Sequence, residues 1–519
     1  MRAVSTPPVP AMAARPKPSP DKPAPSDPPK SPDRPHLDAP DDAKPRTTSK
    51  TMFVQLARQA ELRDLVDMPN TPKRREEAVR RMREFASVEQ DTAIREMKEV
   101  LERQGMKDAK VEVNDRLWIT NGMQVTISGL PGGMMGMSKN GKDTGADKLV
   151  SALENLGSIE DVATMDDLQG AISVPAVAKD SQQTPAGRSA KLPWNLSQIH
   201  ANSAWKAGVD GSGVTVANVD TGVDVQHPAL WSKFKGYSRD GFGQEKAYYD
   251  ATVAQPKVGD TPPDPKDYNG HGTHTMGTMV GADGQGTPVG VAPGAKFIAA
   301  AGLGEGGGDV LGLLKALQFV TAPSDGWNQI DPKSGADIVN NSWGGRGPET
   351  SFTTALRNMA AAGVVNVFAA GNNGMDSKDQ NLGDPGMWTD AITVGAVNKH
   401  KEVSAFSSKG PSPVTDEFKP FVVAPGEGVE STIPNGKYAT FSGTSMAAPH
   451  VAGALALVDQ ELANRKQTKM DLDDAKFVLQ RMAKDIAPKG PDDASGYGII
   501  DLAKMKSAVD ALVKARAAQ

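Results

Sequence analysis

The larger, C-terminal part of the chain is predicted to be an α/β domain, because of the order of its apolar and helical stretches. From Trp194 onward, short stretches of apolar and small residues alternate with helical ones. Short buried stretches of this kind are typical of a mainly parallel sheet with helices on both faces. The expected strands are residues 214–219, 296–301, 336–340, 364–369 and 391–397, and the clearest helices are residues 312–320 and 353–362.

Composition narrows the class of protein. The chain has 519 residues, a net charge of −5 and no cysteine. Nearly balanced charge argues against a nucleic-acid or membrane partner, and the lack of cysteine excludes disulfides and a cysteine nucleophile. The first twenty residues lack the apolar stretch of a secretory signal. We therefore expect a precursor in the cytoplasm, with export by an unconventional route as the alternative.

The N-terminal part divides into three segments. Residues 1–50 hold 14 of the 39 prolines and almost no large apolar residue, which predicts a disordered tail. Residues 51–180 read as a small α+β domain, and residues 181–193 as an exposed linker before a domain at 194–519. In the α+β part we expect a long helical region at 74–104, a helix at 145–156, and strands at 52–56, 110–113, 117–119, 123–127 and 159–163.

Three clusters of small and polar residues carry candidate chemistry. Asp220 follows a buried strand, at the edge where parallel sheets place their sites. His271 opens a helix of small residues, and Ser445 lies in a turn before an apolar helix, where backbone N–H groups are free. Alone, Asp220 reads more simply as a helix cap. His271 and His274 lie three residues apart, but no H-E-x-x-H pattern supports zinc, and we predict no metal site there.

Together these residues supply a nucleophile, a base and an orienting carboxylate. Serine needs a histidine to take its proton, and the histidine needs a carboxylate to hold its tautomer. Asn372, in AAGNNG after another strand, could donate to an oxyanion together with the Ser445 N–H. The order Asp, His, Ser excludes an α/β-hydrolase, in which the serine comes first.

The surroundings of these residues resemble the subtilisin-like serine proteases, and the local motifs are most similar to the bacillopeptidase F branch. The motifs are DTGVD, NGHGTHTMGT, GVAPGA, NNSWG, AAGNNG and SGTSMAAPHVAG, within residues 194–511. The resemblance implies a seven-stranded parallel sheet flanked by helices, serine endopeptidase activity and an N-terminal propeptide that assists folding and inhibits. Asp220 would then orient His271, His271 would act as base and acid, Ser445 as nucleophile and Asn372 as oxyanion donor.

The resemblance also implies a substrate cleft in which a peptide binds as an added strand. Its residues would be Ser342, Trp343, Gly344, Gly304, Gly306, Ala370 and Gly371. Glycine at such positions lets a peptide backbone approach closely. The implied partners are extended protein or peptide substrates and, as intramolecular inhibitor, the chain's own N-terminal region, which we expect to be cut within residues 174–191. Small residues, Gly386 among them, suggest room for an apolar side chain before the cut bond.

The chain departs from the family pattern at two places. Many relatives bind calcium through the loop 281–290, where Asp283 is a candidate ligand, but the carboxylate that relatives supply after the HP dipeptide is Ala229 here. Calcium takes six to eight oxygens, so this loss weakens the expectation of a structural calcium ion, and the chemistry itself requires no cofactor. Residues 236–266 are expected to form a surface loop near the site.

The remaining histidines are expected to be structural. His274 and His450 read as buried and hydrogen-bonded, His227 as ordering a turn, and His36, His200 and His400 show no partner in the sequence. The rival functional hypothesis is a catalytically silent subtilase fold that acts as a binding protein. It requires the loss of a triad or oxyanion residue, and all four are present.

Overall fold

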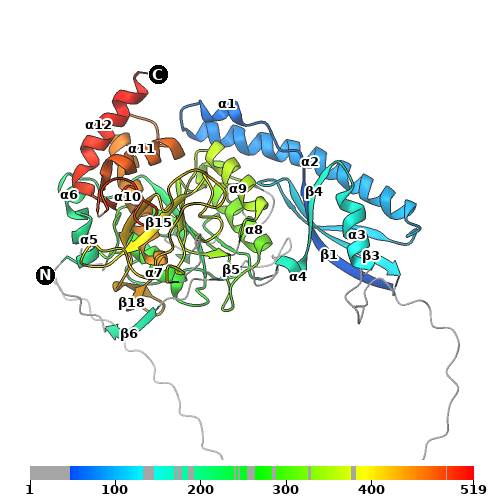
Figure 1. Cartoon of the computed structure of the whole chain (residues 1–519), viewed down its shortest axis with the longest axis horizontal. Coiled ribbons are helices and arrows are strands. Elements are labelled where there is room, and N and C mark those ends of the chain that lie inside the picture. Colours follow the sequence, from blue (N-terminus) through cyan, green and yellow to red (C-terminus); the bar gives the residue numbers. More distant parts are fainter. Residues whose placement is uncertain are drawn as a thin grey trace, which may run out of the picture. The chain divides into compact units, whose positions relative to one another are not determined.

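The computed structural model describes residues 47–131, 145–168, 172–173, 178–184, 192–238, 241–242, 246–253, 263–282, 288–324, 329–345, 347–375, 382–486 and 488–518. The chain divides into two units, Met1–Arg46 and Thr47–Gln519, and the first lies outside the described residues. The predicted tail therefore lies outside them too, except for its last four residues, which begin the first strand. The second unit contains all the elements of the fold and the candidate site (Figure 1).

The N-terminal part of this unit is a four-stranded antiparallel sheet with helices. Its strands run in the order β2-β3-β1-β4. Apolar residues from the sheet and from two helices enclose a small core of their own, which includes Met52, Val54, Met97 and Leu153. The elements are β1 (Thr47–Leu56), α1 (Arg63–Val66), α2 (Pro72–Arg103), β2 (Lys110–Leu117), β3 (Gly122–Pro131), α3 (Gly145–Glu154), β4 (Ile159–Thr164) and α4 (Met165–Leu168).

Two expectations for this part differ from the structure. The strand expected at 110–113 continues to Leu117 as β2, which stays paired with β3 across a shift in register between Val113 and Asp115, whereas residues 118–119 of the second expected strand lie in the turn that follows. β1 begins at Thr47 rather than at Met52, because its first residues pair with the end of β3. Both differences arise from pairing with a distant strand, which local composition does not encode.

The C-terminal part is built on a sheet that is parallel except at one edge. Among the described residues it has nine strands, with β19 alone antiparallel to its neighbour. The parallel α/β sheet of the sequence prediction is confirmed, and β10 and β19 extend the edges beyond the seven strands expected. The order is β10 (Tyr248–Asp250), β11 (Lys296–Ala301), β7 (Thr215–Asp220), β12 (Ile338–Asn341), β14 (Val365–Ala369), β15 (Ile392–Val397), β16 (Val422–Pro425), β20 (Ile499–Ile500) and β19 (Ala483–Lys484).

Helices flank this sheet. α10 (Thr444–Asn464) carries Ser445 in its first turn, and all of its residues as far as Leu462 are buried, which explains why its sequence is apolar around its whole circumference. The other helices are α5 (Trp194–Gln198), α6 (Ala201–Lys206), α7 (His271–Val280), α8 (Val310–Thr321), α9 (Thr350–Ala361), α11 (Leu472–Met482) and α12 (Met505–Arg516), with 3-10 turns at Trp231–Lys233, Pro332–Ser334 and Leu502–Lys504. No described helix is long and apolar enough to span a bilayer.

The insertion at 236–266 differs from the surface loop expected of it. Its described residues form a short hairpin, β8 (Tyr237–Ser238) with β9 (Gly241–Phe242), and then β10, which joins the large sheet as an edge strand in parallel with β11. The Tyr248 hydroxyl donates to the backbone oxygen of Lys266 at 2.9 Å, and the Tyr268 hydroxyl donates to Asp250 at 2.7 Å. The insertion is therefore anchored to the segment that precedes His271.

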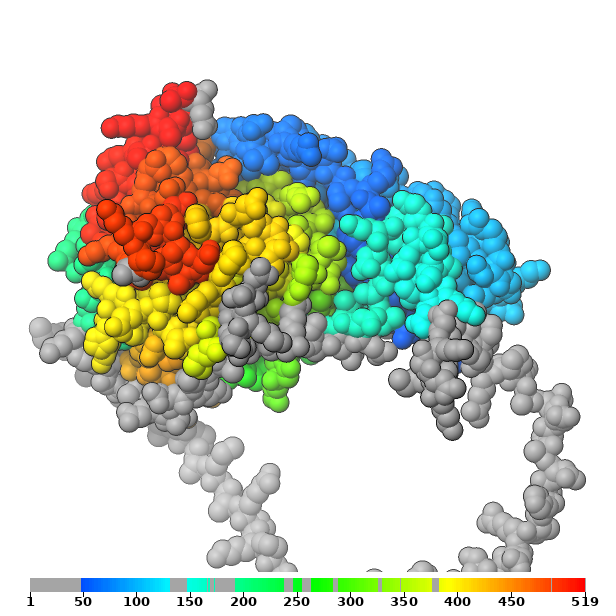
Figure 2. Space-filling model, viewed as in Figure 1, coloured from blue at the N-terminus to red at the C-terminus, as the bar shows by residue number. Residues whose placement is uncertain are grey.

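The N-terminal part packs against the C-terminal part through α1 and the first half of α2, which contact α9. Leu65, Val79 and Met82 belong to the large core rather than to the small one. Arg74 is fully buried and donates to the backbone oxygens of Ala361 at 2.9 Å and Ala360 at 3.0 Å, at the end of α9. Figure 2 shows α1 and α2, in blue, covering the yellow-green segment of α9.

A second set of contacts lies at the end of β2. The backbone N–H groups of Trp118 and Ile119 both donate to Gln318 Oε1 of α8, at 2.8 and 3.2 Å. Asn358 of α9 donates to the backbone oxygen of Ile119 at 2.7 Å. These contacts satisfy backbone N–H and C=O groups of Trp118 and Ile119 that would otherwise be buried without a partner.

A buried carboxylate on α10 predicts an unusual pH dependence of stability. Asp459 accepts a hydrogen bond from the backbone N–H of Met470 at 2.9 Å and is 3% exposed. Burial, and next the negative charge of Asp337, raise the pKa of Asp459 to about 7. The folded state therefore holds a proton that the unfolded state loses near pH 4, so the stabilising effect present below pH 4 is lost as the pH rises through 7.

Asp459→Asn should therefore raise the free energy of unfolding at pH 8, by roughly 2–4 kcal/mol, and change it little at pH 4. The amide resembles the protonated acid and keeps an acceptor for Met470. Denaturant unfolding on a Ser445→Ala background, with the exposed Asp473→Asn as control, measures this difference. A variant no more stable than its parent at pH 8 would contradict the prediction.

Candidate active site

Asp220 and His271 come from different elements and meet at one edge of the sheet. Asp220 is the last residue of β7, and His271 is the first residue of α7. The imidazole Nδ1 lies 2.8 Å from Asp220 Oδ1, and the two side chains are 0–1% exposed. Asp220 also accepts the backbone N–H of Thr221 at 2.7 Å and the Thr275 hydroxyl at 3.2 Å. These donors hold the carboxylate in its orientation toward the ring.

Two glycines allow this close approach. Gly222 has φ +94°, and a Cβ there would lie 1.8 Å from the backbone oxygen of Lys266. A Cβ on Gly272 would lie 2.0 Å from the backbone oxygen of Gly222. The loop after Asp220 and the first turn of α7 therefore pack backbone to backbone, which only glycine permits at these positions.

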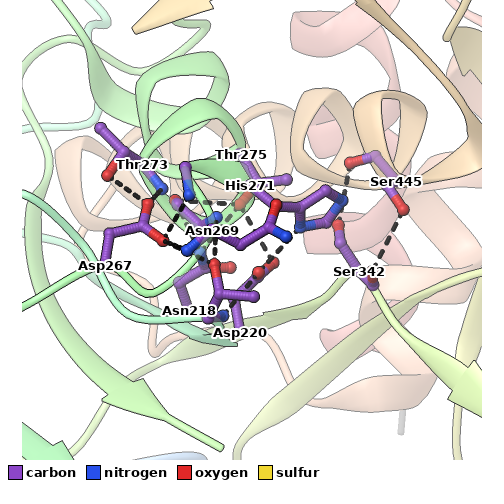
Figure 3. A network of polar contacts seen from close by, with 12 residues as sticks. Asn218, Asp220, Asp267, Asn269, His271, Thr273, Thr275, Ser342 and Ser445 are labelled. Carbon is purple, nitrogen blue, oxygen red and sulfur yellow. Dashed lines mark hydrogen bonds and ion pairs between the residues drawn. The ribbon is translucent and has the colours of Figure 1, made fainter. Parts of the chain in front are cut away.

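Ser445 lies at the other end of the site, buried in the first turn of α10. Its hydroxyl donates to the backbone oxygen of Ser342 at 3.1 Å, and its own backbone oxygen accepts the Ser342 hydroxyl at 2.9 Å. The Nε2 atom of His271 has no hydrogen-bond partner among the described residues. The structure thus brings Asp220, His271, Ser342 and Ser445 into one network, but the Ser445 hydroxyl bonds Ser342 and not the imidazole (Figure 3).

Asn372 follows β14 and faces the start of α10. Its Oδ1 accepts the backbone N–H and the hydroxyl of Thr444, both at 2.9 Å. Its Nδ2 is buried without a partner among the described residues. Because Oδ1 is held by Thr444, the amide presents Nδ2 as a free donor beside the Ser445 backbone N–H, which has no acceptor within the helix. This is the arrangement that an oxyanion hole requires.

The predicted cleft residues occupy different environments. Gly344 belongs to β13 (Gly344–Gly345), which pairs with β5 (Ile172–Ser173) of the N-terminal region. The Trp343 side chain is 1% exposed and packs against the rings of Phe352 and Phe368, so it contributes to the core.

The remaining cleft predictions lie around these strands. Gly304 bonds Gly307 in a turn that also contains Gly306. The residue of this stretch that bonds β5 is Gly308, whose N–H donates to the backbone oxygen of Ile172 at 3.1 Å. Ala370 is buried in a small apolar cluster with Leu382 and Met387. Gly371 has φ +106°, and its N–H donates to the Thr444 hydroxyl.

The N-terminal region thus contributes two short strands that pair with segments close in the chain to Ser342 and Ser445. β5 lies between β13 and Gly308. Further along, β6 (Ala178–Thr184) pairs antiparallel with β18 (Lys437–Ser442), which itself pairs with β17 (Val429–Ile433). Residues 181–184, expected as linker, belong to this strand, because β18 offers them an unpaired edge. Residues 174–177 lie outside the described residues.

A cavity opens beside the start of α7. It has a volume of about 380 Å³, and its walls include Asp267, Asn269, Gly270, Ile433 and Phe441. The cavity lies on the side of the site where β18 runs, next to the backbone that β6 pairs with. It offers space for a side chain of a peptide bound along β18.

His274 and His450 are buried and hydrogen-bonded, as expected, and His36 lies outside the described residues. His274 is fully buried, its Nε2 lies 3.1 Å from the backbone oxygens of Val429 and Ala439, and burial lowers its pKa to about 3. His450 accepts from Asn195 at 2.8 Å, and burial lowers its pKa to about 4. His200, for which the sequence shows no partner, has one in the structure. Its Nδ1 lies 2.7 Å from Asp501, which is 301 positions away and therefore has no signal in the local sequence.

The described residues give little support to calcium at the predicted loop. Ala229 is 1% exposed and packs with Val289 and Tyr438, so this position offers an apolar wall and no oxygen ligand. Asp283 lies outside the described residues. No group of three or more His, Asp or Glu side chains that could hold a metal ion occurs in the described part of the chain.

Sequence reasoning missed Asp267. This residue accepts five hydrogen bonds from the segments that carry Asp220 and His271. The signal available was an aspartate four residues before a histidine that opens a helix, but its partners come from another part of the chain.

Comparison with known proteins shows which family the chain resembles over most of its C-terminal part. The model of the Subtilase family matches residues 211–498, more than half of the chain. The chain is 36% identical to Bacillopeptidase F of Bacillus subtilis over 337 residues, which is 62% of this chain and 23% of that protein. It therefore spans about a quarter of that relative's length.

The chain aligns with most of the length of two shorter relatives. An intracellular serine protease of Paenibacillus polymyxa is 34% identical over 314 residues, 60% of this chain and 86% of that protein. The major intracellular serine protease of Bacillus subtilis is 34% identical over 306 residues, 57% of this chain and 85% of that protein. With the family model and these relatives in agreement, the chain belongs to the subtilase family, as its motifs predicted.

Proposed function

We propose that this protein is a serine endopeptidase that hydrolyses proteins through an acyl-enzyme intermediate. The observation that carries the proposal is the buried Asp220–His271 hydrogen bond of 2.8 Å, with the free Nε2 on the side of Ser445. The proposed reaction requires the Ser445 hydroxyl to exchange its bond to Ser342 for one to Nε2. The names of the relatives, which are serine proteases, support the same reaction class.

The proposed mechanism uses this chain's residues in a fixed order. His271 takes the hydroxyl proton as Ser445 attacks the carbonyl carbon of the substrate, and Asp220 stabilises the imidazolium that results. Asn372 Nδ2 and the Ser445 backbone N–H donate to the oxyanion. His271 then protonates the leaving amine, and water attacks the acyl-enzyme by the reverse path. The substrate lies extended, paired with Gly344 as β5 is in the precursor.

We also propose that the N-terminal region is an intramolecular inhibitor. β5 pairs with β13, which follows Ser342, and β6 pairs with β18, which precedes Ser445, whose side chain is fully buried. A substrate chain would need the same edge of β13 and the same edge of β18. The bond cut on maturation is then expected between β5 and β6, within residues 174–177, a narrower interval than the residues 174–191 expected from the sequence.

A fluorophosphonate that modifies activated serines tests the proposed activity. The full-length protein is incubated until casein hydrolysis is constant and is then titrated with the reagent. We expect one equivalent to abolish hydrolysis and peptide mass mapping to find the adduct on Ser445. A folded protein that neither hydrolyses casein nor takes up the reagent, even after limited cleavage by a foreign protease, would favour the silent binding fold.

Asn372→Ala should lower kcat and leave KM nearly unchanged, because the oxyanion forms only on the way to the intermediate. Subtilisin is the enzyme in which the loss of this donor is best known, at about 10²–10³ in kcat. Steady-state hydrolysis of a peptide anilide measures the two constants separately. A rise in KM by a similar factor, with kcat unchanged, would show that the side chain binds substrate instead.

The cellular location and a structural calcium ion stay predictions from the sequence. Activity in culture medium, followed against a cytoplasmic marker protein, tests the location. Thermal unfolding with and without a calcium chelator tests the ion.

A further inference from the structure

We propose that Asp267 is a positioning residue of the active site, which holds the loop of Asp220 and the first turn of α7 in the arrangement that brings His271 onto Asp220. This inference rests on the proposed function, because it assigns a role within the same site. The hydrogen bonds of Asp267 go to backbone and hydroxyl groups next to Asp220 and His271 in the chain. Its effect on the two catalytic side chains is therefore exerted through their neighbours.

One oxygen of Asp267 bonds the loop after Asp220 and the turn before His271 together. Oδ1 accepts the Thr221 hydroxyl at 2.7 Å and the backbone N–H groups of Asn269 at 3.0 Å and Gly270 at 2.8 Å. The Thr221 hydroxyl in turn accepts the backbone N–H of Gly272 at 3.0 Å. The residue after Asp220 and the residue after His271 are therefore linked through a single hydroxyl, whose orientation Asp267 determines.

The other oxygen caps α7. Oδ2 accepts the backbone N–H of Thr273 at 2.8 Å and the Thr273 hydroxyl at 2.5 Å. The helix has no capping side chain at Gly270, so this contact replaces the usual cap. The Thr273 hydroxyl also accepts the backbone N–H of Asp224 at 2.9 Å, a second link to the loop of Asp220. In Figure 3, Asp267 and Thr273 lie at one end of the network and Ser342 and Ser445 at the other.

The number and kind of these donors make the carboxylate hard to replace. A carboxylate accepts all five hydrogen bonds, whereas an amide would turn its NH₂ group toward at least one donor. Burial raises the pKa of Asp267, and its hydrogen bonds oppose that rise. A displacement of α7 by a fraction of an ångström would lengthen the Nδ1–Oδ1 bond, on which the tautomer of His271 depends.

The test compares Asp267→Asn and Thr221→Val with the wild-type protein. First, the self-processing rate constant is measured by intact mass, since this intramolecular step has no KM. Second, kcat and KM are measured on mature enzymes, with maturation completed by a trace of foreign protease where needed. We expect Asp267→Asn to lower the processing rate and kcat about 10–100-fold and KM to change less than twofold. The double variant should lose less than the product of the single losses.

A spectroscopic measurement separates positioning from a general loss of stability. On a Ser445→Ala background, which keeps the chain whole, the strongly deshielded proton of the Nδ1–H···Oδ1 hydrogen bond is followed by NMR. We expect Asp267→Asn to broaden or shift this resonance. The matched control is Asp492→Asn, because Asp492 likewise accepts Ala494 N, Ser495 N and the Ser495 hydroxyl in a turn, away from the site.

The outcomes separate this inference from the proposed function. If wild type hydrolyses casein and Asp267→Asn has unchanged kcat and an unchanged resonance, the positioning role is wrong and the proposed function stands. If Asp267→Asn fails to fold, the same measurements are made on Thr221→Val. An unchanged kcat and an unchanged resonance in that variant would overturn the inference. If wild type itself lacks activity that depends on Ser445, the proposed function fails first.

Discussion

Ser445→Ala should leave the precursor whole and lower casein hydrolysis by about six orders of magnitude, the loss known for subtilisin when this residue or its histidine is removed. The alanine cannot form the acyl-enzyme, so neither its own chain nor an added substrate is cut by that path. The intact mass of the wild-type and variant precursors, measured over time, shows whether each chain is cut. Wild type is expected to lose its N-terminal residues through a cut between β5 and β6 before casein hydrolysis begins.

The masses of the fragments give the position of the first cut, which tests the proposed inhibitory arrangement. A first cut within residues 174–177 agrees with the pairing of β5 to β13 and of β6 to β18. A first cut elsewhere would contradict the proposed inhibitory arrangement but not the proposed reaction. Processing of Ser445→Ala at the wild-type rate, with no foreign protease present, would show that Ser445 is not the nucleophile.

Asp220→Asn is expected to lower kcat by about four orders of magnitude, with little change in KM. The amide has nearly the shape of the carboxylate, but it carries no charge to stabilise the imidazolium, and its NH₂ group can face Nδ1 and impose the wrong tautomer. Losses of this size are established for the aspartate of such triads in subtilisin and in an unrelated fold. Steady-state hydrolysis of a peptide anilide by the mature variant measures kcat and KM.

The neighbouring Asp224→Asn is the control for this variant. Asp224 lies in the same loop, and its carboxylate accepts the backbone N–H groups of Gln226 at 3.1 Å and Asn435 at 2.9 Å. Near-normal kcat in this control and a large loss in Asp220→Asn would assign the effect to the charge beside the imidazole ring. Equal losses in both would indicate that the loop after β7 had been disturbed as a whole.

Much of the large domain could be predicted because its signals are local. The strand at 296–301 was predicted with the bounds that β11 has, since a short run of buried residues between polar turns encodes a strand in a parallel sheet. The positions of Asp220, His271 and Ser445 at the ends of such elements were readable for the same reason. Their motifs then identified the family, and the family comparison confirmed it.

Other features depend on contacts between residues far apart in the chain. Tyr248 lies in an edge strand because β11 offers an open edge, and His200 meets Asp501 across 301 positions. Arg74 begins the helical region expected at 74–104, yet it is buried because it donates to the carbonyl groups of Ala360 and Ala361 at the end of α9. Local composition contains no information about these partners.

The sequence by itself determined the fold class of the large domain, the family, and the residues that we propose for the reaction. The tertiary structure decided how these residues are held. The Ser445 hydroxyl donates to Ser342, and β5 and β6 pair with the edges of β13 and β18. Asp267 accepts hydrogen bonds both from the loop after Asp220 and from the turn before His271. The physical reason is that motifs record which side chains are present. The direction of each hydrogen bond is settled only when distant backbone groups compete for the same donors and acceptors.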